Sequence, residues 1–450
     1  MEDDAASGSA GRRPSNDALV GCAMAAVAVV LGLLNANRSF SYDEAITYSN
    51  FINGGSPRTA LTTQVVFNNH PMFSFFEVIL WRIGLVSEAA QRLLPVSCGA
   101  ATVGLIAWYT SCRSTIVGGS VAGSVLLLNP MYFDLFRAVR GYSLAVLGIT
   151  VAGIAIQRSW HDPRRRWLAL QGVAMVIAVT THAYSAVFIL TFAVATLALG
   201  HLRARLVIAW VASAVVAVVI ALPILDDALD NAEARGNRYV PGFGEFTLRE
   251  VLGRTTPVVF IVGVLVLVGA ISVGQRSTRH AVAVVAGAVV PLAVFMLIWQ
   301  IAQPFDLYSR FFIGLMPFVA VLAGLGSSRL PDVPAGAVGI AVVVLLAPTV
   351  RTLIDREAGT RDAGQLVDEA RAMDLQVCGY GAEAIWVYTA QIEYADLEQL
   401  DNCDVLVNGL GLRDGQLELV NNHYAARLRV DGSISLWGDT AAIERLGAGR

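Results

Sequence analysis

Apolar segments of about 20 residues recur along most of this chain, and they restrict its fold more than any other feature. A helix of that length crosses the hydrocarbon core of a bilayer. Twelve candidate segments are present, at 17–36, 71–86, 91–112, 115–133, 141–157, 167–182, 184–200, 204–222, 256–274, 279–300, 310–326 and 334–350. The sequence therefore predicts an all-α polytopic membrane protein.

The composition of the chain supports this prediction. Of its 450 residues, 55% are hydrophobic and 15% are charged, and the mean hydropathy is +0.60. A soluble domain carries about 25% charged residues. The net charge of −3 gives no basis for binding nucleic acid. Both ends of the chain are polar: residues 1–16 predict a short tail, and 351–450, with short alternating apolar segments, predict a small soluble α/β domain.

The placement of arginine predicts how the spans are oriented, because short cytoplasmic loops carry an excess of basic residues. The segment "QRSWHDPRRRW" has four arginines and one acidic residue. The pairs Arg203/Arg205 and Arg276/Arg279 mark two further loops of the same kind. We therefore expect these loops in the cytoplasm, and the 223–255 loop and the C-terminal domain outside.

The segment at 71–86 decides the number of spans. Arginines before the first span place the N-terminus inside and Asp43 and Glu44 outside, and Arg113 is expected inside. A single span, not two, therefore has to lie between these acids and Arg113. Because 71–86 is short and contains Glu77 and Arg82, we assign it as an interfacial helix with access to water, within an outer loop at 37–90. The membrane module then covers 17–350 with about eleven helices, the N-terminus inside and the C-terminus outside. In the alternative the segment crosses the membrane, and a twelve-span topology conflicts with the arginine rule.

Charged and polar residues gather at the predicted outer ends of the helices. The stretch "SFSYDEAITYSN" directly follows the first span and contains Asp43 and Glu44. The other candidates at this level are His70, Arg137, Arg140, His182, Tyr184, Tyr308 and Arg310. A carboxylate can remove a proton from a hydroxyl, and arginines can hold a phosphate with paired donors. This pattern indicates a site for an anionic lipid head group and a polar acceptor.

Each candidate also has a purely structural interpretation. Asp43 and Glu44 can be first-turn acids that interact favourably with a helix dipole. Arg137 and Arg140 can be interfacial arginines whose stems lie along apolar surface. Residue type and spacing leave both interpretations open.

The order of these segments resembles the C-type glycosyltransferases, close to family 39, which are polytopic enzymes that use polyprenyl-phosphate sugars. The resemblance rests on "YDEA", "NNHPMFSFFEVILWRIG", "SEAAQRLLPVSCG", "NPMYFDLFRAVRGYS" and "THAYS", which together cover about residues 17–200 in the family's order. A weaker match is "SRFFIGLMPF", and the C-terminal domain matches nothing in the family. Met72 stands where the family has a second proline, Phe311 where it has a tyrosine, and Ala183 is inserted between the histidine and tyrosine.

The resemblance implies a catalytic role for the outer-loop acids and a surface position for the outer-loop helix. Under this interpretation Asp43 and Glu44 are catalytic, Arg137, Arg140, Arg310 and Tyr308 bind the donor phosphate, and His70, His182 and Tyr184 are further site candidates. Asp43 acts as general base in a single displacement through an oxocarbenium-like state. Some members of the family bind a divalent metal beside the outer-loop acid and others do not, so the need for a metal stays open.

We therefore expect a bacterial cell-membrane glycosyltransferase with its site on the extracytoplasmic face. Its expected partners are a polyprenyl-phosphate-linked hexose or pentose donor, an acceptor glycan, lipid or protein of the cell envelope, and the bilayer. Two alternatives are a secondary transporter, for which midplane ionisable residues and internal repeats are expected, and a non-catalytic scaffold presenting the C-terminal domain. In that domain Cys378 and Cys403 either form a disulfide or remain buried thiols.

Overall fold

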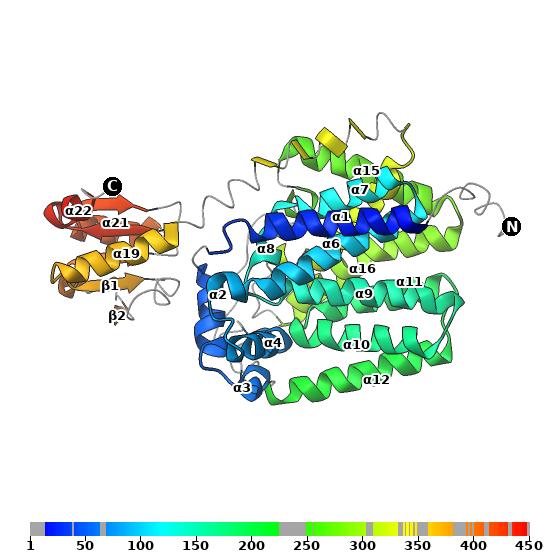
Figure 1. The fold of residues 1–450 in the computed structure, drawn as a ribbon, viewed down its shortest axis with the longest axis horizontal. Coiled ribbons are helices and arrows are strands. Elements are labelled where there is room, and N and C mark those ends of the chain that lie inside the picture. Colours follow the sequence, from blue (N-terminus) through cyan, green and yellow to red (C-terminus); the bar gives the residue numbers. More distant parts are fainter. Residues whose placement is uncertain are drawn as a thin grey trace. The chain divides into compact units, whose positions relative to one another are not determined.

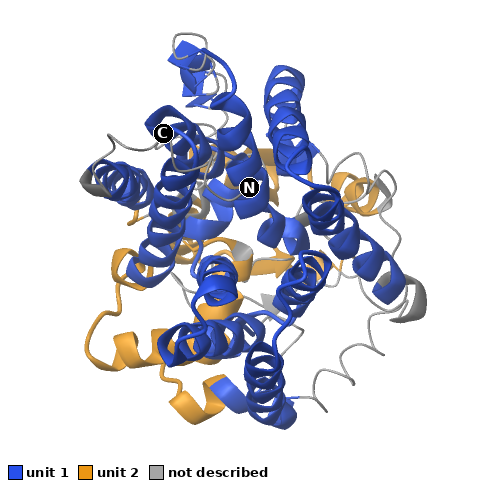
Figure 2. Cartoon of the chain, turned by 90° about the vertical axis from the view of Figure 1, so that its right-hand side faces the viewer, with its two compact units in different colours: residues 1–34, 61–73, 93–350 blue, residues 35–60, 74–92, 351–450 orange. Residues whose placement is uncertain are grey.

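The computed structural model describes most of the chain and divides it into two compact units. The described residues are 14–37, 40–63, 69–224, 249–253, 255–302, 309–331, short stretches between 336 and 348, 359–380, 393–394, 397, 400–408, 414–430 and 434–447. Unit 1 comprises Met1–Leu34, Leu61–Phe73 and Leu93–Val350, and unit 2 comprises Asn35–Ala60, Ser74–Arg92 and Arg351–Arg450 (Figure 2).

Unit 1 is a bundle of helices, many of which run side by side (Figure 1). Its helices are α1 (Pro14–Leu33), α6 (Leu93–Arg113), α7 (Ile116–Leu127), α8 (Pro130–Arg137), α9 (Tyr142–His161), α10 (Arg165–Thr181), α11 (Ser185–Ala198), α12 (Ala204–Ala221), η2 (Leu222–Ile224), α15 (Thr256–Gly274), α16 (Thr278–Ala302), η3 (Ser309–Leu315) and α17 (Met316–Ser327). Local signals fix several of the starts. For example, the Asn129 side chain accepts from the Tyr132 backbone N–H, and Pro130 occupies the first helical position of α8.

Small residues let the helices of unit 1 approach one another closely. A Cβ added to Gly269 of α15 would lie 2.0 Å from the Leu322 carbonyl oxygen of α17. A Cβ added to Gly326 of α17 would in turn lie 2.0 Å from the Leu265 carbonyl oxygen. Lipid tails are as apolar as leucine, so helices in a bilayer associate largely through such close packing.

Seven described helices are long and apolar enough to cross a membrane, judged by length and composition. They are Asn16–Leu33, Glu88–Arg113, Tyr142–His161, Ala204–Ile224, Thr256–Gly274, Thr278–Ile298 and Arg310–Ser327. A bent pair, α7 and α8, adds an eighth if its two helices, which meet at 68°, form one broken span. The chain is thus a multi-pass membrane protein. The count of eleven and the orientation stay predictions: α10 and α11 have 17 and 14 residues, and 334–350 is described only in short stretches.

The predicted outer loop folds into short helices. They are α2 (Tyr42–Thr47), the π-helix η1 (Tyr48–Ile52), α3 (Pro57–Thr62), α4 (Pro71–Arg82) and α5 (Glu88–Gln91). The 12 residues of α4 give a helix about 18 Å long, which is shorter than the roughly 30 Å of a bilayer's hydrocarbon core. An orientation of α4 along the membrane surface stays a prediction.

The expectation that Glu77 of α4 is in contact with water is wrong. Its side chain is 0% exposed, and neither carboxyl oxygen has a hydrogen-bond partner among the described residues. Burial raises the pKa of this carboxyl well above its ordinary value. A buried, unpaired carboxylate would lose its hydration without compensation, so burial favours the protonated form of this group.

The C-terminal part of unit 2 is a small α/β fold, as predicted. Five strands form one sheet in the order β2-β1-β3-β5-β4. They are β1 (Val377–Tyr380), β2 (Glu393–Tyr394), β3 (Val405–Asn408), β4 (Ala426–Arg429) and β5 (Ser435–Gly438), and the helices are α19 (Gly359–Ala372), η4 (Leu400–Asn402), α21 (Asp414–His423) and α22 (Thr440–Gly447). The strand β1 is parallel to β2 and β3, whereas β5 is antiparallel to β3 and β4.

Alternate residues of each central strand serve two separate cores. Val405 and Val407 of β3 join a cluster with residues of α19 and α22, whereas Leu406 between them joins a cluster with Val420 and Tyr424. Successive side chains of a strand point to opposite faces. Helices therefore cover both faces of this sheet, which explains why strands β3 and β5 are buried along their whole length.

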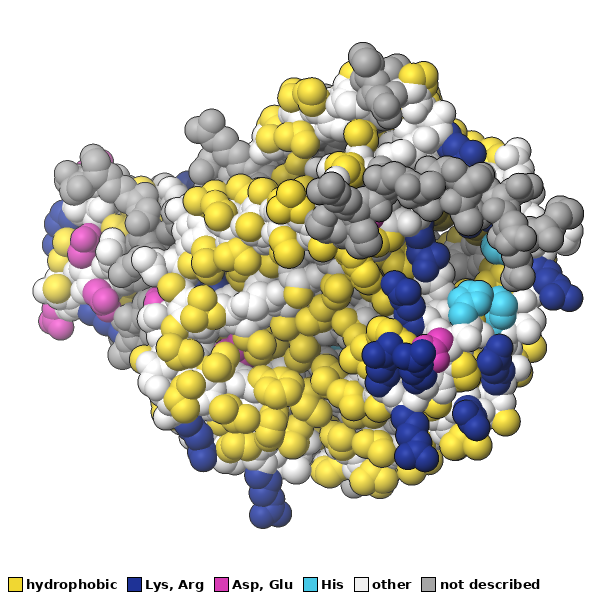
Figure 3. Space-filling model, turned by 45° about the vertical axis from the view of Figure 1, so that its right-hand side comes forward, with side chains coloured by type: hydrophobic (Ala, Val, Ile, Leu, Met, Phe, Trp, Pro, Cys, Tyr) yellow, Lys and Arg dark blue, Asp and Glu magenta, His cyan; other side chains and the backbone are white. Residues whose placement is uncertain are grey.

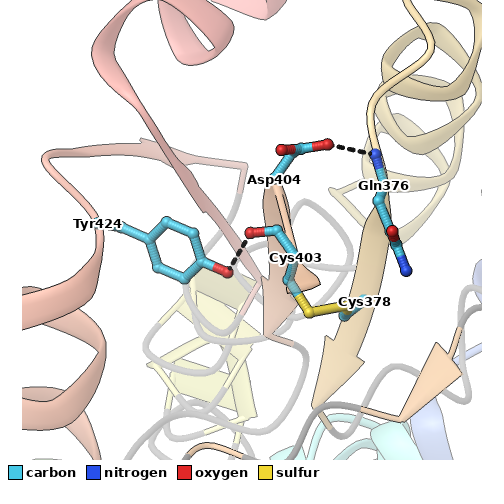
Figure 4. The surroundings of a disulfide bond; sticks show 5 residues. All are labelled: Gln376, Cys378, Cys403, Asp404 and Tyr424. Carbon is cyan, nitrogen blue, oxygen red and sulfur yellow. Dashed lines mark hydrogen bonds between the residues drawn. A yellow bond between two sulfur atoms is a disulfide. The ribbon is translucent and has the colours of Figure 1, made fainter. Parts of the chain in front are cut away.

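Cys378 and Cys403 form a disulfide, which settles the alternative left open by the sequence. The bond joins β1 to the residue two before β3, with a Cα–Cα distance of 5.7 Å (Figure 4). Two hydrogen bonds hold the same region: the Tyr424 hydroxyl donates to the Cys403 carbonyl oxygen at 2.9 Å, and the Gln376 N–H donates to the Asp404 carboxylate at 2.8 Å. Disulfides persist in oxidising compartments, so the bond supports the predicted extracytoplasmic location of this domain.

Candidate functional site

The outer-loop acids, Asp43 and Glu44, lie in the first turn of α2, where carboxylates interact favourably with the helix dipole. Adjacent residues of a helix point in different directions, and the two acids differ accordingly. Asp43 is partly exposed, whereas Glu44 is 1% exposed. The carboxylate that solvent can reach is therefore that of Asp43.

Glu44 is held by an arginine that the sequence reasoning did not assign to the site. The Arg92 guanidinium, 0% exposed, donates from Nη2 to both Glu44 carboxylate oxygens at 3.1 and 3.2 Å. It also donates from Nη1 to the Ala36 carbonyl oxygen at 3.0 Å. Glu44 in turn accepts from the Ser41 N–H at 2.8 Å. Together Glu44 and Arg92 fix the start of α2, and with it the helix that carries Asp43.

The cation of Arg92 is enclosed by aromatic side chains. Its guanidinium carbon lies 5.2 Å from the centre of the Phe40 ring, which stacks on Tyr48 at 4.8 Å. Cation–π contact stabilises a desolvated guanidinium. The sequence signal for this role was an arginine directly before a long apolar helix, in the segment "SEAAQRLLPVSCG". A position at the start of a span is equally typical of an interfacial arginine, so the pattern did not single it out.

In unit 1 the structure brings together four of the predicted residues, here called the histidine–arginine cluster: His70, Arg140, His182 and Arg310. The His70 Nε2 atom accepts from Arg140 Nε and Nη2 at 3.2 and 3.1 Å. Its Nδ1 atom lies 3.3 Å from the Thr181 carbonyl oxygen. Because Nε2 is an acceptor, Nδ1 carries the proton and the imidazole is neutral.

Aromatic rings enclose this cluster. The rings of His70, His182 and Tyr142 lie 5.1–5.3 Å apart, centre to centre, in all three pairings. Tyr184 stacks on Phe311 at 4.1 Å and lies 5.2 Å from His182. The sequence reasoning did not assign Tyr142 to the site, although it follows Arg140 by two residues in "RGYS".

The two histidines of the cluster stay uncharged at neutral pH. Burial and then the positive charge of Arg140 hold the pKa of His70 well below its ordinary value. Burial, followed by the charges of Arg140 and Arg310, lowers the pKa of His182 to about 3. The net positive charge of the cluster therefore resides on the two guanidinium groups, which is suited to an anion with several acceptor oxygens.

Gly141 allows the cluster to close. A Cβ at this position would lie 2.6 Å from the Thr181 side chain and 2.7 Å from the His70 Cβ, distances that atoms in van der Waals contact do not reach. Glycine between Arg140 and Tyr142 thus lets the chain pass close to His70. The motif "RGYS" supplies a cation, a close approach and an aromatic ring in consecutive residues.

Arg137 differs from Arg140 in its surroundings. It is 0% exposed, and its guanidinium donates to the carbonyl oxygens of Gly32 and Leu34 at 3.4 and 2.9 Å and lies over the Phe133 ring at 4.7 Å. Cations stabilise the unpaired carbonyl groups at a helix C-terminus. These contacts account for a structural role at the end of α1, and phosphate binding by Arg137 stays a prediction.

Two points of the sequence analysis remain, the role of Tyr308 and the binding of a metal ion. Tyr308 lies outside the described residues. Among the described residues, no group of three or more His, Cys, Asp or Glu side chains is arranged to hold a metal ion.

Comparison with known proteins identifies the fold. No family model matches this sequence, and no protein of curated function matches it significantly. Among solved structures, the apo form of ArnT from Cupriavidus metallidurans is similar with a TM-score of 0.62 and 13% identity, over 92% of this chain and 97% of that one. The form of ArnT bound to undecaprenyl phosphate is similar with a TM-score of 0.56, 15% identity and the same coverage. The chain thus has the fold of the C-type membrane glycosyltransferases, as expected.

Proposed function

We propose that this chain, which has the C-type glycosyltransferase fold, transfers a sugar from a polyprenyl-phosphate donor to an acceptor hydroxyl outside the cytoplasm. The observation that carries the proposal is the histidine–arginine cluster. It presents two guanidinium groups, beside imidazoles that stay neutral, in a chain whose structural relative ArnT binds undecaprenyl phosphate.

In this proposal Arg140 and Arg310 hold the donor phosphate. Hydrogen bonds to charged groups contribute about 1.5–3 kcal/mol each, and fixed donors stabilise charge that develops on a leaving group. His70 is a positioning residue, because its Nε2 atom accepts from Arg140 and thereby sets the plane of the guanidinium. Arg137 and Tyr308 are retained as predicted phosphate ligands, and His182 and Tyr184 as the wall of the anion site.

Asp43 is the proposed general base. Its partly exposed carboxylate can accept the proton of an acceptor hydroxyl while that oxygen bonds to the anomeric carbon and the lipid phosphate departs. Glu44, predicted as catalytic, has contacts that support a positioning role instead, since its carboxylate is occupied by Arg92 and the Ser41 N–H. The sugar, hexose or pentose, and the acceptor, a cell-envelope glycan, lipid or protein, belong to the proposal at this general level.

The experiment that tests the proposal measures donor-lipid binding and product in parallel. Purified protein and its Arg140→Gln and Arg310→Gln variants are titrated with undecaprenyl phosphate and observed by native mass spectrometry. Loss of one charge-assisted contact is expected to weaken binding by about 10- to 150-fold. Arg158→Gln, in the last turn of α9, is the matched control and should bind as the unmodified protein does.

Mass spectrometry of cell-envelope glycans, with and without the protein, provides the second readout. A missing glycan in the deletion strain, restored by the unmodified protein and not by Arg140→Gln, is expected. Binding of undecaprenyl phosphate that is insensitive to both arginine variants, together with an unchanged glycan profile, would reject the proposal. Unchanged glycans with lipid export lost would favour the transporter alternative.

A further inference from the structure

A cavity of about 920 Å³ lies within unit 1 among α6, α9, α11, α15, α16 and α17. Its wall is mainly apolar, with side chains such as Leu267, Leu292 and Phe318. The residues of the histidine–arginine cluster do not line it. The volume falls in the range of about 300–1,000 Å³ typical of ligand sites, so this cavity is a candidate site separate from the one described above.

One end of the cavity is basic. Arg113, Arg276 and His280 line it there, together with Tyr109 and Gln157. The Arg113 Nη2 and the Tyr109 hydroxyl both donate to the Gln157 amide oxygen, at 2.6 and 3.0 Å. Among the residues that the structure describes, no carboxylate forms an ion pair with Arg113 or Arg276. The charge of both guanidinium groups is therefore available to a ligand.

The surroundings increase this positive charge. Arginine and histidine side chains gather at one end of the bundle (Figure 3). Asp162, the acidic residue of the "QRSWHDPRRRW" loop, is paired with Arg164 at 2.8 Å. These are the loops that the arginine rule predicts in the cytoplasm, and in that predicted orientation the basic end of the cavity faces the cytoplasmic leaflet.

The depth of the cavity matches one leaflet. Along α16 its lining extends from His280 to Leu292, which is about 18 Å at 1.5 Å per residue. One leaflet contributes about 15 Å of hydrocarbon. The cavity is therefore long enough for one acyl chain attached to a head group at Arg113 and Arg276.

We propose that this cavity binds one anionic glycerophospholipid of the cytoplasmic leaflet. Its phosphate contacts Arg113 and Arg276, and its acyl chains lie against the apolar wall. Basic pockets between membrane helices on the cytoplasmic side recognise such head groups through charge, whereas the apolar wall selects only for a hydrocarbon chain. The ligand differs from the proposed sugar donor in its head group and in the side of the membrane from which it enters.

The test uses the full chain in nanodiscs of phosphatidylcholine that contain a minor fraction of phosphatidylglycerol, followed by native mass spectrometry of the lipid retained. About one phosphatidylglycerol per protein is expected, in preference to phosphatidylcholine. Each arginine near a membrane surface contributes roughly a five-fold preference for anionic lipid, so Arg113→Gln/Arg276→Gln should weaken retention by about thirty-fold. Arg203→Gln/Arg205→Gln, which removes the same charge from residues outside the lining, should not.

A second variant tests the apolar part of the site. A Cβ added to Gly287 of α16 meets nothing within 4 Å, and this residue lines the cavity. Gly287→Phe should therefore fold and exclude the lipid, whereas Val289→Phe, at a position 53% exposed on the same helix, should retain it. Equal retention by Gly287→Phe and Val289→Phe would overturn the proposal. Retention of phosphatidylcholine equal to that of phosphatidylglycerol, or occupation of the cavity by undecaprenyl phosphate instead, would also overturn it.

Discussion

The ion pair between Glu44 and Arg92 allows a prediction whose size follows from burial. Both side chains are essentially inaccessible to water, at 1% and 0% exposure. Arg92→Met preserves the length and apolar stem of the side chain but leaves Glu44 as a buried carboxylate without the guanidinium that balances its charge, while the Ser41 N–H still donates to it. Removing one partner of a buried ion pair costs about 3–5 kcal/mol.

The expected effect is local opening of α2, because this helix has only six residues and contributes little stability of its own. At 1.4 kcal/mol per decade, the loss corresponds to amide exchange about two to four orders of magnitude faster. Hydrogen exchange of the peptide that covers residues 40–52, followed by mass spectrometry, measures this rate. Peptides of α9 in the same sample are the internal control and should exchange at the original rate.

The double variant Glu44→Gln/Arg92→Met separates a buried ion pair from general loss of packing. Glutamine carries no charge, so the double variant should recover part of the protection lost in Arg92→Met. Two results would refute the conclusion that the ion pair fixes the start of α2. The first is an amide exchange rate in the Arg92→Met protein within about two-fold of that in the unmodified protein. The second is that the effects of the two substitutions on this rate add without coupling.

Three further predictions concern unit 1 and the C-terminal domain. Folding lowers the pKa of His182 to about 3, so the contribution of this residue to the free energy of unfolding should be constant above about pH 6.5. Below that pH the contribution should fall by up to about 1.4 kcal/mol per pH unit. His182→Gln should therefore reduce the pH dependence of thermal unfolding between pH 7 and 5. Gly141→Ala should displace His70, since the added Cβ would lie 2.7 Å from the His70 Cβ, and weaken binding of undecaprenyl phosphate with little change in expression. Cys378→Ser/Cys403→Ser opens a loop closed across 25 residues, and should lower the unfolding free energy of the C-terminal domain by about 3.5 kcal/mol in urea titration.

Local patterns of the sequence identified much of the architecture. Recurrent apolar segments revealed the helical bundle, and alternation after residue 351 revealed the α/β domain, because each reflects a periodicity of its own backbone. Spacing alone did not give helix lengths: α10 has 17 residues and α11 has 14, shorter than a full span. Apolar composition records contact with lipid or protein alike and does not define where a helix ends.

The functional roles of individual residues were harder to predict, since they depend on contacts distant in sequence. Arg137 and Arg140 are three residues apart, yet one contacts carbonyl oxygens of α1 and the other His70. Glu44 and Arg92 are separated by 48 positions. They belong to two different motifs, "YDEA" and "SEAAQRLLPVSCG", and neither motif indicates that the two residues form a pair. Motif order could identify the candidates His70, Arg140 and His182, but only the tertiary structure shows that His70 is buried and that the imidazoles of His70 and His182 are neutral.

The measurement that tests the central claim most directly is the rate of sugar transfer by Asp43→Asn. Membranes from cells that carry only this variant are assayed for the envelope glycan of the unmodified strain, and binding of undecaprenyl phosphate is measured on the same preparation. Asparagine preserves the size of the side chain and removes its basicity, so transfer is expected to be at least about a hundred-fold slower with lipid binding retained. Glu88→Gln, an acid of the first turn of α5 in the same loop, should transfer at the original rate. Transfer by Asp43→Asn at the original rate would contradict the account.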